Sequence, residues 1–179
     1  MSHTFEYEGR TFEIEMAQDE FMGAPWEEED GHDLVSEWTT RDKRPGEWVL
    51  CEDRGSKRYY DFAEAIEIAK KQGWDTEPCG VGTKGERAVR AVSADFNWLR
   101  RWCNDDWVWG VIHVTLLDDD FDKTGYDDYL GGVEWEFTIS EYIMECARDM
   151  AKEIMYRVRE EDEKERIANR FREAMVCGL

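Results

Sequence analysis

A run of carboxylates between two tryptophans is the part of the sequence whose residue types most directly suggest a function. It starts at Trp26 and ends near Trp38. Dense carboxylates attract a basic partner over long range, and large aromatic side chains commonly anchor protein interfaces. The candidate partner contacts are therefore Trp26, Glu27, Glu28, Glu29, Asp30, Asp33 and Trp38. The alternative is that these charges only keep the protein soluble.

Residues 118–124 are rich in aspartate, the kind of ligand that calcium prefers. In a calcium loop that starts at Asp118, Lys123 occupies the sixth position, where the sharp turn requires glycine. Tyr129 occupies the twelfth position, where a bidentate glutamate is required. We therefore expect a solvated turn between two strands here. Because the three histidines and five cysteines show no zinc-ligand spacing, the sequence predicts neither a metal nor a cofactor.

Histidines are the other residues that could carry out chemistry. His32 stands among carboxylates and could act as a general base, or it could be an ordinary loop residue. The chain has no nucleophile elbow, no Walker loop and no dinucleotide fingerprint. One enzyme hypothesis stays open, in which a small ligand binds on a strand face formed by Trp107, Trp109 and His113.

The charge of the chain is concentrated in two segments. The net charge is −20, from 43 acidic and 23 basic residues. Residues 1–33 contain eleven acids and one base, and residues 104–128 contain eight acids and one base. Direct contact with a nucleic-acid backbone requires clustered lysine and arginine, and binding to an anionic membrane surface requires them too. We therefore predict neither direct nucleic-acid binding nor membrane binding.

The composition is that of a folded intracellular protein. With 179 residues, 41% of them hydrophobic, the chain can bury one core, and we expect a single domain over residues 1–179. No apolar run approaches the roughly 20 residues of a membrane helix, and the first residues lack the features of a signal peptide. The five widely spaced cysteines fit a reducing compartment. The expected location is the cytoplasm.

The first half of the chain predicts two hairpins and two helices. Apolar residues alternate on both sides of Glu8-Gly9, which predicts a β-hairpin. Residues 17–46 form a long acidic loop, and a second hairpin turns at residues 53–56. Asp61 caps a helix that ends before Gly73. Thr83 opens another helix with a capping box, and its apolar stripe runs to Cys103.

The second half predicts a central strand, a partner strand and a long helix. Residues 107–117 are apolar on both faces, which indicates a strand covered on both sides that buries Trp109. A partner strand is expected near residues 133–137, after a bulge or close backbone approach at Gly131-Gly132. A capping box at Thr138 starts the last helix. Its stripe stops at an acidic spacer, so residues 160–176 are expected to project.

Together these elements predict an α+β fold. It consists of an antiparallel sheet of about five or six strands and three helices, of which the C-terminal helix is long.

Several motifs resemble a family of small uncharacterised acidic proteins encoded in tailed-phage and prophage genomes. They are Gly-Ala-Pro-Trp-Glu-Glu at residues 23–28, Thr-Thr-Arg-Asp-Lys-Arg-Pro-Gly at 39–46, Arg-Gly-Ser-Lys-Arg-Tyr-Tyr-Asp at 54–61, Ala-Asp-Phe at 94–96 and Trp-Cys-Asn-Asp at 102–105. The likeness spans roughly residues 5–155. It implies a phage accessory protein in a bacterial cytoplasm and carries over no catalytic residue.

These observations lead to one principal functional hypothesis and two alternatives. The principal one is a phage-encoded acidic protein that inhibits a host nucleic-acid-binding or defence protein by occupying its basic surface. One alternative is a protein-interaction module without charge mimicry, and the other is the small-ligand enzyme described above. The sequence leaves the partner and the oligomeric state open.

Overall fold

The computed structural model describes residues 2–28, 33–74 and 81–177, and its contacts divide the chain into two compact units. Unit 1 comprises residues 1–19 and 109–179, and unit 2 comprises residues 20–108. The sequence predicted a single domain over residues 1–179. Whether the two units unfold together as one domain stays a prediction.

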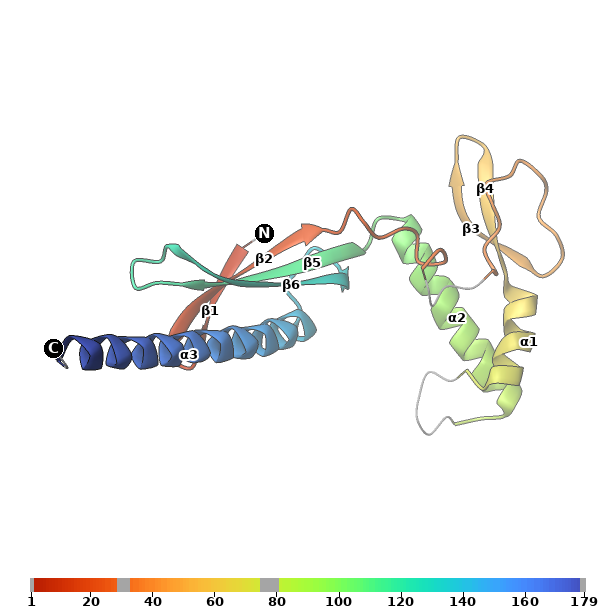
Figure 1. The fold of residues 1–179 in the computed structure, drawn as a ribbon. Helices are drawn as coiled ribbons and strands as arrows, with labels where there is room; N and C mark the ends of the chain where they lie inside the picture. Colours follow the sequence, from red (N-terminus) through yellow and green to blue (C-terminus); the bar gives the residue numbers. More distant parts are fainter. Residues whose placement is uncertain (1, 29–32, 75–80, 178–179) are drawn as a thin grey trace. The chain divides into compact units, whose positions relative to one another are not determined.

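Unit 1 contains a four-stranded antiparallel sheet. Its strands are β1 (Ser2–Tyr7), β2 (Arg10–Gln18), β5 (Val108–Leu117) and β6 (Lys123–Trp135), in the order β1-β2-β5-β6 (Figure 1). β2 pairs with β5, so unit 2 is inserted between two adjacent strands of this sheet. β6 is much longer than the predicted partner strand near residues 133–137.

The opening hairpin confirms the sequence prediction. Glu8 and Gly9 both have positive φ angles, 49° and 75°, as a two-residue type I′ turn requires. The turn fixes the register so that Phe12 and Ile14 point to the same face and are fully buried. On β5, Ile112 and Val114 are also fully buried. These residues form the apolar face of the sheet.

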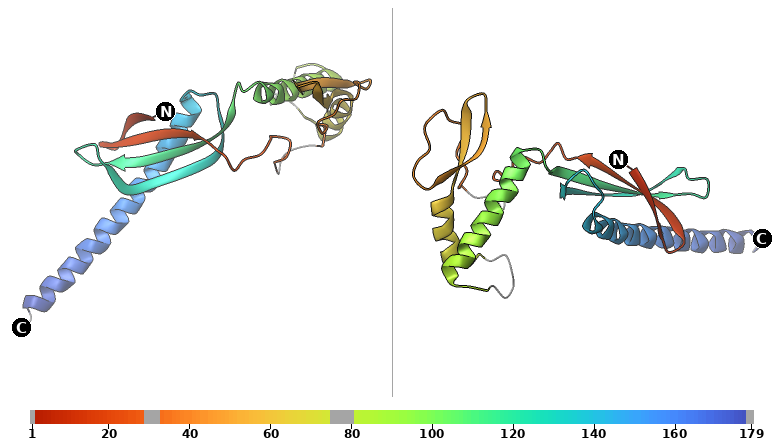
Figure 2. Two further views of the ribbon diagram at one scale, coloured as in Figure 1. Left: turned by 90° about the horizontal axis from the view of Figure 1, so that it is seen from above. Right: turned by 180° about the vertical axis from the view of Figure 1, so that it is seen from behind.

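Helix α3 (Glu141–Cys177) runs along one side of this sheet (Figure 2). Ser140 caps it, because its hydroxyl accepts from the Ile143 N–H at 3.2 Å. The predicted cap at Thr138 is therefore two residues too early. The helix buries a stripe that includes Ile143, Ala147, Ala151 and Ile154.

The last part of α3 continues as unbroken helix through the acidic run, with its large apolar side chains exposed. Ile167, Phe171 and Met175 are 46%, 69% and 73% exposed. At about 100° per residue, Ile167 lies roughly 140° around the helix from Ile154. The apolar residues beyond the acidic run therefore start a different face and do not resume the buried stripe.

β5 differs in two respects from the predicted strand. Trp107 precedes it and is fully buried in unit 2, where its Nε1 donates to the Trp98 carbonyl at 3.1 Å. Trp109 and His113 lie in unit 1 and are only half-buried. β5 is central, as predicted, but one of its faces is open enough to leave these two side chains partly exposed.

Unit 2 contains a hairpin and two helices. The hairpin strands are β3 (Glu47–Asp53) and β4 (Ser56–Asp61), and the helices are α1 (Phe62–Gln72) and α2 (Lys84–Cys103). The turn of this hairpin has the same backbone conformation as the turn at Glu8-Gly9, because Arg54 and Gly55 also both have positive φ angles. These four elements confirm the sequence prediction closely.

The caps of the two helices are also as predicted. The Asp61 side chain accepts from the Glu64 N–H, and Gly73 ends α1 in the left-handed conformation. Thr83 and Glu86 form the complete capping box of α2. Each device satisfies backbone groups that a helix end would otherwise leave without partners.

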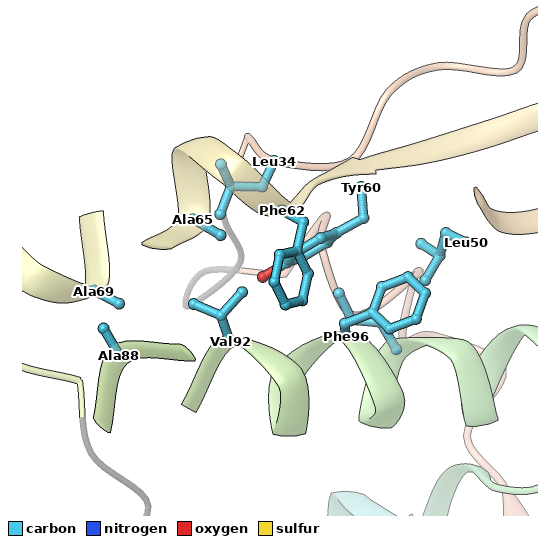
Figure 3. Close-up of a cluster of buried hydrophobic side chains, with 10 residues drawn as sticks. Leu34, Leu50, Tyr60, Phe62, Ala65, Ala69, Ala88, Val92 and Phe96 are labelled. Atoms are coloured by element: carbon cyan, nitrogen blue, oxygen red, sulfur yellow. The ribbon is translucent and has the colours of Figure 1, made fainter. Parts of the chain in front are cut away.

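Three aromatic rings, those of Tyr60, Phe62 and Phe96, pack together in the core of unit 2 among aliphatic side chains (Figure 3). Phe62 and Phe96 meet edge to face, with ring centroids 6.4 Å apart, and Tyr60 packs against both. The fully buried Tyr60 donates its hydroxyl to the Asp95 carboxylate at 2.5 Å. Burial, together with this carboxylate, raises the pKa of Tyr60.

The described residues thus form three helices and six antiparallel strands, which confirms the predicted α+β class and the long last helix. The strands are divided between a four-stranded and a two-stranded sheet. None of the described helices combines the length and apolar character needed to cross a membrane.

Candidate functional site

The acidic segment between β2 and β3 is a loop, close to the predicted residues 17–46, although β2 extends to Gln18. Backbone contacts with β4 order its second half. Val35 forms an isolated bridge with Tyr60, and Thr39 forms one with Lys57. The Asp61 N–H also donates to the Leu34 carbonyl at 2.8 Å.

The two candidate tryptophans of this loop have different environments. The ring of Trp26 packs edge-on against Trp102 at 5.2 Å, as part of the unit 2 core. Trp38 is 45% exposed. The Arg58 guanidinium lies over both rings, 5.2 Å from Trp26 and 5.3 Å from Trp38. Trp26 is thus a packing residue, and Trp38 is the aromatic side chain of the pair that a partner can reach.

The candidate carboxylates also have local partners. Glu28 Oε1 accepts from the Gly23 N–H at 2.6 Å, and Glu27 Oε2 accepts from the Ala24 N–H at 3.4 Å. Both side chains thereby support the turn that precedes them. Asp33 is exposed. Glu29, Asp30 and His32 lie outside the described residues.

A second acidic display forms the tip of the β5–β6 hairpin. Asp118 organises it, because its Oδ1 accepts from the N–H groups of Asp120 and Asp122, both at 2.9 Å. Phe121 lies within this loop with a φ of 64° and is 67% exposed. The expected solvated turn is therefore an ordered loop that presents an aromatic ring among carboxylates. We call residues 118–122 the acidic tip.

Some carboxylates elsewhere in the structure form ion pairs with lysine or arginine, among them Glu47, Glu67 and Glu15. Glu47 receives two hydrogen bonds from Arg41, at 2.6 and 2.7 Å. Within the described ranges, by contrast, no lysine or arginine forms an ion pair with the four aspartates of the acidic tip. From the sequence, this segment was expected to be a solvated turn, because its calcium-loop pattern fails at Lys123 and Tyr129. The signal that this expectation did not use was Phe121, a large apolar residue in an otherwise charged turn.

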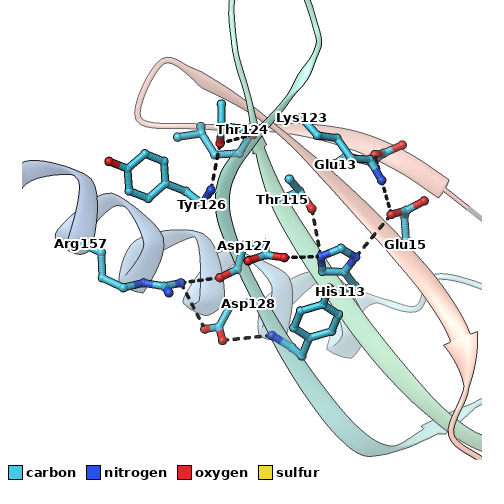
Figure 4. Close-up of polar contacts among 12 residues, drawn as sticks. Glu13, Glu15, His113, Thr115, Lys123, Thr124, Tyr126, Asp127, Asp128 and Arg157 are labelled. Carbon is cyan, nitrogen blue, oxygen red and sulfur yellow. Dashed lines mark hydrogen bonds and ion pairs between the residues drawn. The ribbon is translucent and has the colours of Figure 1, made fainter. Parts of the chain in front are cut away.

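The open face of the unit 1 sheet carries a polar network centred on His113 (Figure 4). Its Nε2 lies 3.1 Å from Asp127 Oδ2 and 3.2 Å from Thr115 Oγ1, and its Nδ1 lies 3.4 Å from Glu15 Oε2. Tyr129 stacks on the imidazole, with ring centroids 4.0 Å apart. The histidine therefore links β5 to β2 on one side and to β6 on the other.

Lys123 completes this network from β6. Its Nζ contacts Glu15 Oε2 at 2.5 Å and Glu13 Oε2 at 3.0 Å. The hydrogen bond from Lys123 is the main reason that the pKa of Glu15 lies below its ordinary value. Because both ring nitrogens of His113 already have protein partners, the geometry suits a cross-strand clamp better than a base that faces a substrate.

The three residues of the small-ligand face that the sequence suggested are divided between the units, since Trp107 belongs to unit 2 and Trp109 and His113 belong to unit 1. Among the residues that the structure describes, no group of three or more potential metal ligands comes together. The thiols of Cys51, Cys103 and Cys146 are free.

Comparisons of the chain with protein-family models, curated proteins and solved structures find no match.

Proposed function

We propose that this protein binds a basic surface of another protein through the acidic tip, residues 118–122, with help from the carboxylates near Trp38. The observation that carries this proposal is the pairing of four un-neutralised aspartates with the exposed ring of Phe121. Exposed charges of one sign accelerate association with an oppositely charged surface, and an aromatic side chain supplies contact area at low entropic cost.

The local geometry favours charge display over simple solubility. Like charges on neighbouring residues repel each other, so a tip of four aspartates costs free energy that scattered charges would not. Asp118 nevertheless holds this turn in one conformation through two backbone hydrogen bonds. A solubilising surface does not need an ordered conformation, whereas a recognition loop benefits from one.

The identity of the partner is the finer part of the proposal. The resemblance to phage accessory proteins suggests a host nucleic-acid-binding or defence protein, whose phosphate-binding surface the carboxylates would occupy. The net charge of −20 is consistent with such competition. Inhibition would then follow because nucleic acid and this protein require the same basic residues on the partner.

A second candidate function is an interaction that does not depend on charge. Ile167, Phe171 and Met175 expose apolar surface on the last part of α3. Binding through these residues would survive about 0.5 M salt, where electrostatic screening acts within a few ångströms. Binding through the acidic tip would weaken strongly under the same conditions.

The experiment captures a partner from nuclease-treated bacterial lysate and compares two variants with equal changes of charge. One variant carries Asp119→Asn, Asp120→Asn and Asp122→Asn in the acidic tip. The control carries Asp162→Asn, Glu163→Gln and Glu165→Gln, which are exposed residues of α3. We expect the tip variant to associate at least about tenfold more slowly with an unchanged melting temperature, while the control associates almost as fast as wild type.

Phe121→Ser measures what the aromatic ring contributes to partner binding, apart from the charges of the aspartates. This variant should raise the dissociation rate more than it lowers the association rate. Added nucleic acid should displace the wild-type protein from the captured partner. If the tip variant and the control slow association equally, only total charge matters, and a specific role for the acidic tip is wrong.

A further inference from the structure

Unit 2 contains a hollow whose lining contrasts with the acidic character of the chain. Its volume is about 590 Å³, and it lies between β3 and the C-terminal half of α2. Small-molecule sites typically have volumes of roughly 300–1,000 Å³, so this hollow is large enough for a small ligand. Its lining combines cations, amides and aromatic rings, among them Lys43, Trp48, Phe96, Asn97, Arg100 and Asn104.

The cations of this hollow are available to a ligand. Lys43 and Arg100 are both exposed, and across the described ranges neither forms an ion pair with a carboxylate. The lining also includes one carboxylate, Glu52, but its Oε2 lies 3.4 Å from Lys57 Nζ. The hollow therefore presents two unpaired positive charges in a protein whose net charge is −20.

An exposed ring supplies a stacking surface in the same hollow. Trp48 lies flat against Phe62, with centroids 3.9 Å apart and an angle of 4° between the planes. Phe96 meets Trp48 edge-on at 5.1 Å. Although these contacts fix the indole, Trp48 remains 44% exposed. A pre-positioned, partly exposed indole is a favourable platform for a planar ring, and each nucleobase has one.

We propose that this hollow binds a mononucleotide, a nucleobase that carries a phosphate group. The base stacks on Trp48, and the phosphate contacts the Arg100 guanidinium and the Lys43 ammonium group. Asn97 and Asn104 offer amide donors and acceptors to the polar edge of the base or to the ribose hydroxyls. A nucleic-acid chain fits less well, because binding its many phosphates requires more clustered lysine and arginine than the two cations of this lining.

The test titrates the full-length protein with adenosine 5′-monophosphate and follows heat release together with the NMR signal of the Trp48 indole N–H. Adenosine and inorganic phosphate are titrated separately, to measure the stacking and anionic contributions. We expect the nucleotide to bind with a Kd below about 1 mM and each fragment to bind at least about tenfold more weakly. The Trp48 signal should shift as binding saturates.

Arg100→Gln and Lys43→Gln should each weaken nucleotide binding, the former by about tenfold or more. The matched control is Arg54→Gln, which removes an arginine that is 94% exposed in the β3–β4 turn, outside the hollow. Trp48→Leu should weaken the nucleotide but not inorganic phosphate. All four variants are checked for wild-type melting.

Three results with the nucleotide and its fragments would overturn the proposal. They are no binding up to about 10 mM nucleotide, equal weakening by Arg54→Gln and Arg100→Gln, and inorganic phosphate binding as tightly as the nucleotide. A single-stranded DNA oligomer that binds more tightly per site than the nucleotide would also overturn it, in favour of a nucleic-acid site. Because these variants leave the acidic tip intact, failure here does not affect the test of partner binding.

Discussion

The two units build their cores from different residues and from different parts of the chain. Unit 2 uses one continuous stretch, and its core centres on the rings of Tyr60, Phe62 and Phe96. Unit 1 joins the first 19 residues to the last 71, and its core is largely aliphatic. In unit 2 the sequence neighbours β3 and β4 pair, whereas in unit 1 β2 pairs with β5 across 89 intervening residues.

This difference indicates how each unit can form. Contacts between elements that are close in sequence cost little chain entropy, so unit 2 can fold without the rest of the protein. Unit 1 must close a long connection before β2 and β5 meet, and a folded unit 2 shortens that connection. The two proposed binding sites are also divided between the units. Unit 1 contains the acidic tip, and unit 2 contains the hollow.

Dissection of the chain is the test with the largest expected effect. We expect residues 20–108 alone to unfold cooperatively in urea and to give dispersed NMR spectra. In unit 1, the Asp19 N–H donates to the Trp109 carbonyl at 2.8 Å, so a short glycine-serine link can replace unit 2. That linked protein should also fold. If neither piece folds alone, the single-domain prediction for residues 1–179 is correct.

Trp107 and Trp109, which are two residues apart, allow the packing of the two units to be compared one side chain at a time. Trp107→Ala should lower the free energy of unfolding of unit 2 by about 3–5 kcal/mol, because the ring is fully buried and stacks on Trp98 at 4.7 Å. Trp109→Ala should cost unit 1 clearly less, since that ring is half-buried. Urea unfolding followed by circular dichroism measures both costs. Equal costs would mean that the half-buried Trp109 contributes as much to stability as the fully buried Trp107.

Two glycines of β6 test how closely unit 1 is packed. A Cβ on Gly131 would lie 2.7 Å from Asp19 Oδ2, and Asp19 is buried and accepts from the Gly132 N–H at 3.0 Å. Gly131→Ala should therefore cost about 1–3 kcal/mol. Gly125→Ala is the control, because its Cβ would meet no atom within 4 Å, and it should change stability by less than about 0.5 kcal/mol. A harmless Gly131→Ala would show that Asp19 moves freely.

Acid should reveal a difference between the ion pairs of the two units. The hydrogen bond from Arg41 lowers the pKa of Glu47 from its ordinary value of 4.5, so this pair stabilises unit 2 above that pH. The stabilisation should disappear as the pH falls through the lower, folded-state pKa. Wild type and Glu47→Gln should therefore differ in urea stability at pH 7, and the difference should shrink as the pH falls below 4.5 and through the lowered pKa of Glu47.

Glu15→Gln is the matched variant in unit 1. Its carboxylate is 40% exposed and pairs with Lys123, which is 48% exposed, so solvent and salt screen the interaction. We expect a smaller loss at pH 7 that 0.5 M salt removes, while the loss in Glu47→Gln persists. A larger loss in Glu15→Gln would make the His113 network the stronger electrostatic element.

The smallest effect is expected from removing the end of α3. Deletion of residues 160–179 breaks the hydrogen bond from Tyr126 Oη to Glu161 Oε2, an exposed contact, and leaves the buried stripe intact. Unit 1 should lose less than about 1 kcal/mol, whereas Ile154→Ala in the buried stripe should cost about 2–5 kcal/mol. A deletion that unfolds unit 1 would show that Ile167 and Phe171 pack on a partner or on a second copy.

The turns and helix caps were predictable from the sequence, because interactions between residues close in sequence determine them. Both hairpin turns place glycine where a positive φ is required, and the caps at Asp61 and Thr83 follow from side chains that satisfy nearby N–H groups. The sequence predicted a bulge or a close backbone approach at Gly131-Gly132, and the structure places the Asp19 carboxylate directly against the backbone of these glycines.

Long-range features were not predictable from one sequence. The pairing of β2 with β5 depends on which of several apolar strands meet, and alternation alone does not determine this. Trp107 and Trp109 fit one strand face equally well, yet the strand begins at Val108 and separates them. β6 was predicted too short, because its first half faces the polar network with Lys123 and Asp127 and lacks an apolar period.

The sequence predicted the residue types of the candidate site but not its position in the chain. The predicted combination of carboxylates with an aromatic side chain agrees with the geometry of the acidic tip. The predicted place, however, was near Trp26, whose ring packs against the core. Charge density identifies a segment, whereas exposure depends on tertiary packing. The cations of the hollow, Lys43 and Arg100, are 57 positions apart in the sequence, and no local pattern connects them.

The insertion of unit 2 between β2 and β5 also has a consequence for synthesis on the ribosome. At about 5–20 residues per second, translation of the 89 inserted residues takes roughly 4–18 seconds. Throughout that interval the β1–β2 hairpin has emerged without β5, and the edge of β2 is open to other nascent chains. Glu13 and Glu15 alternate along that edge with the apolar residues of the future core. Charged residues at such positions discourage strand addition, so these two glutamates protect the nascent chain before Lys123 is translated.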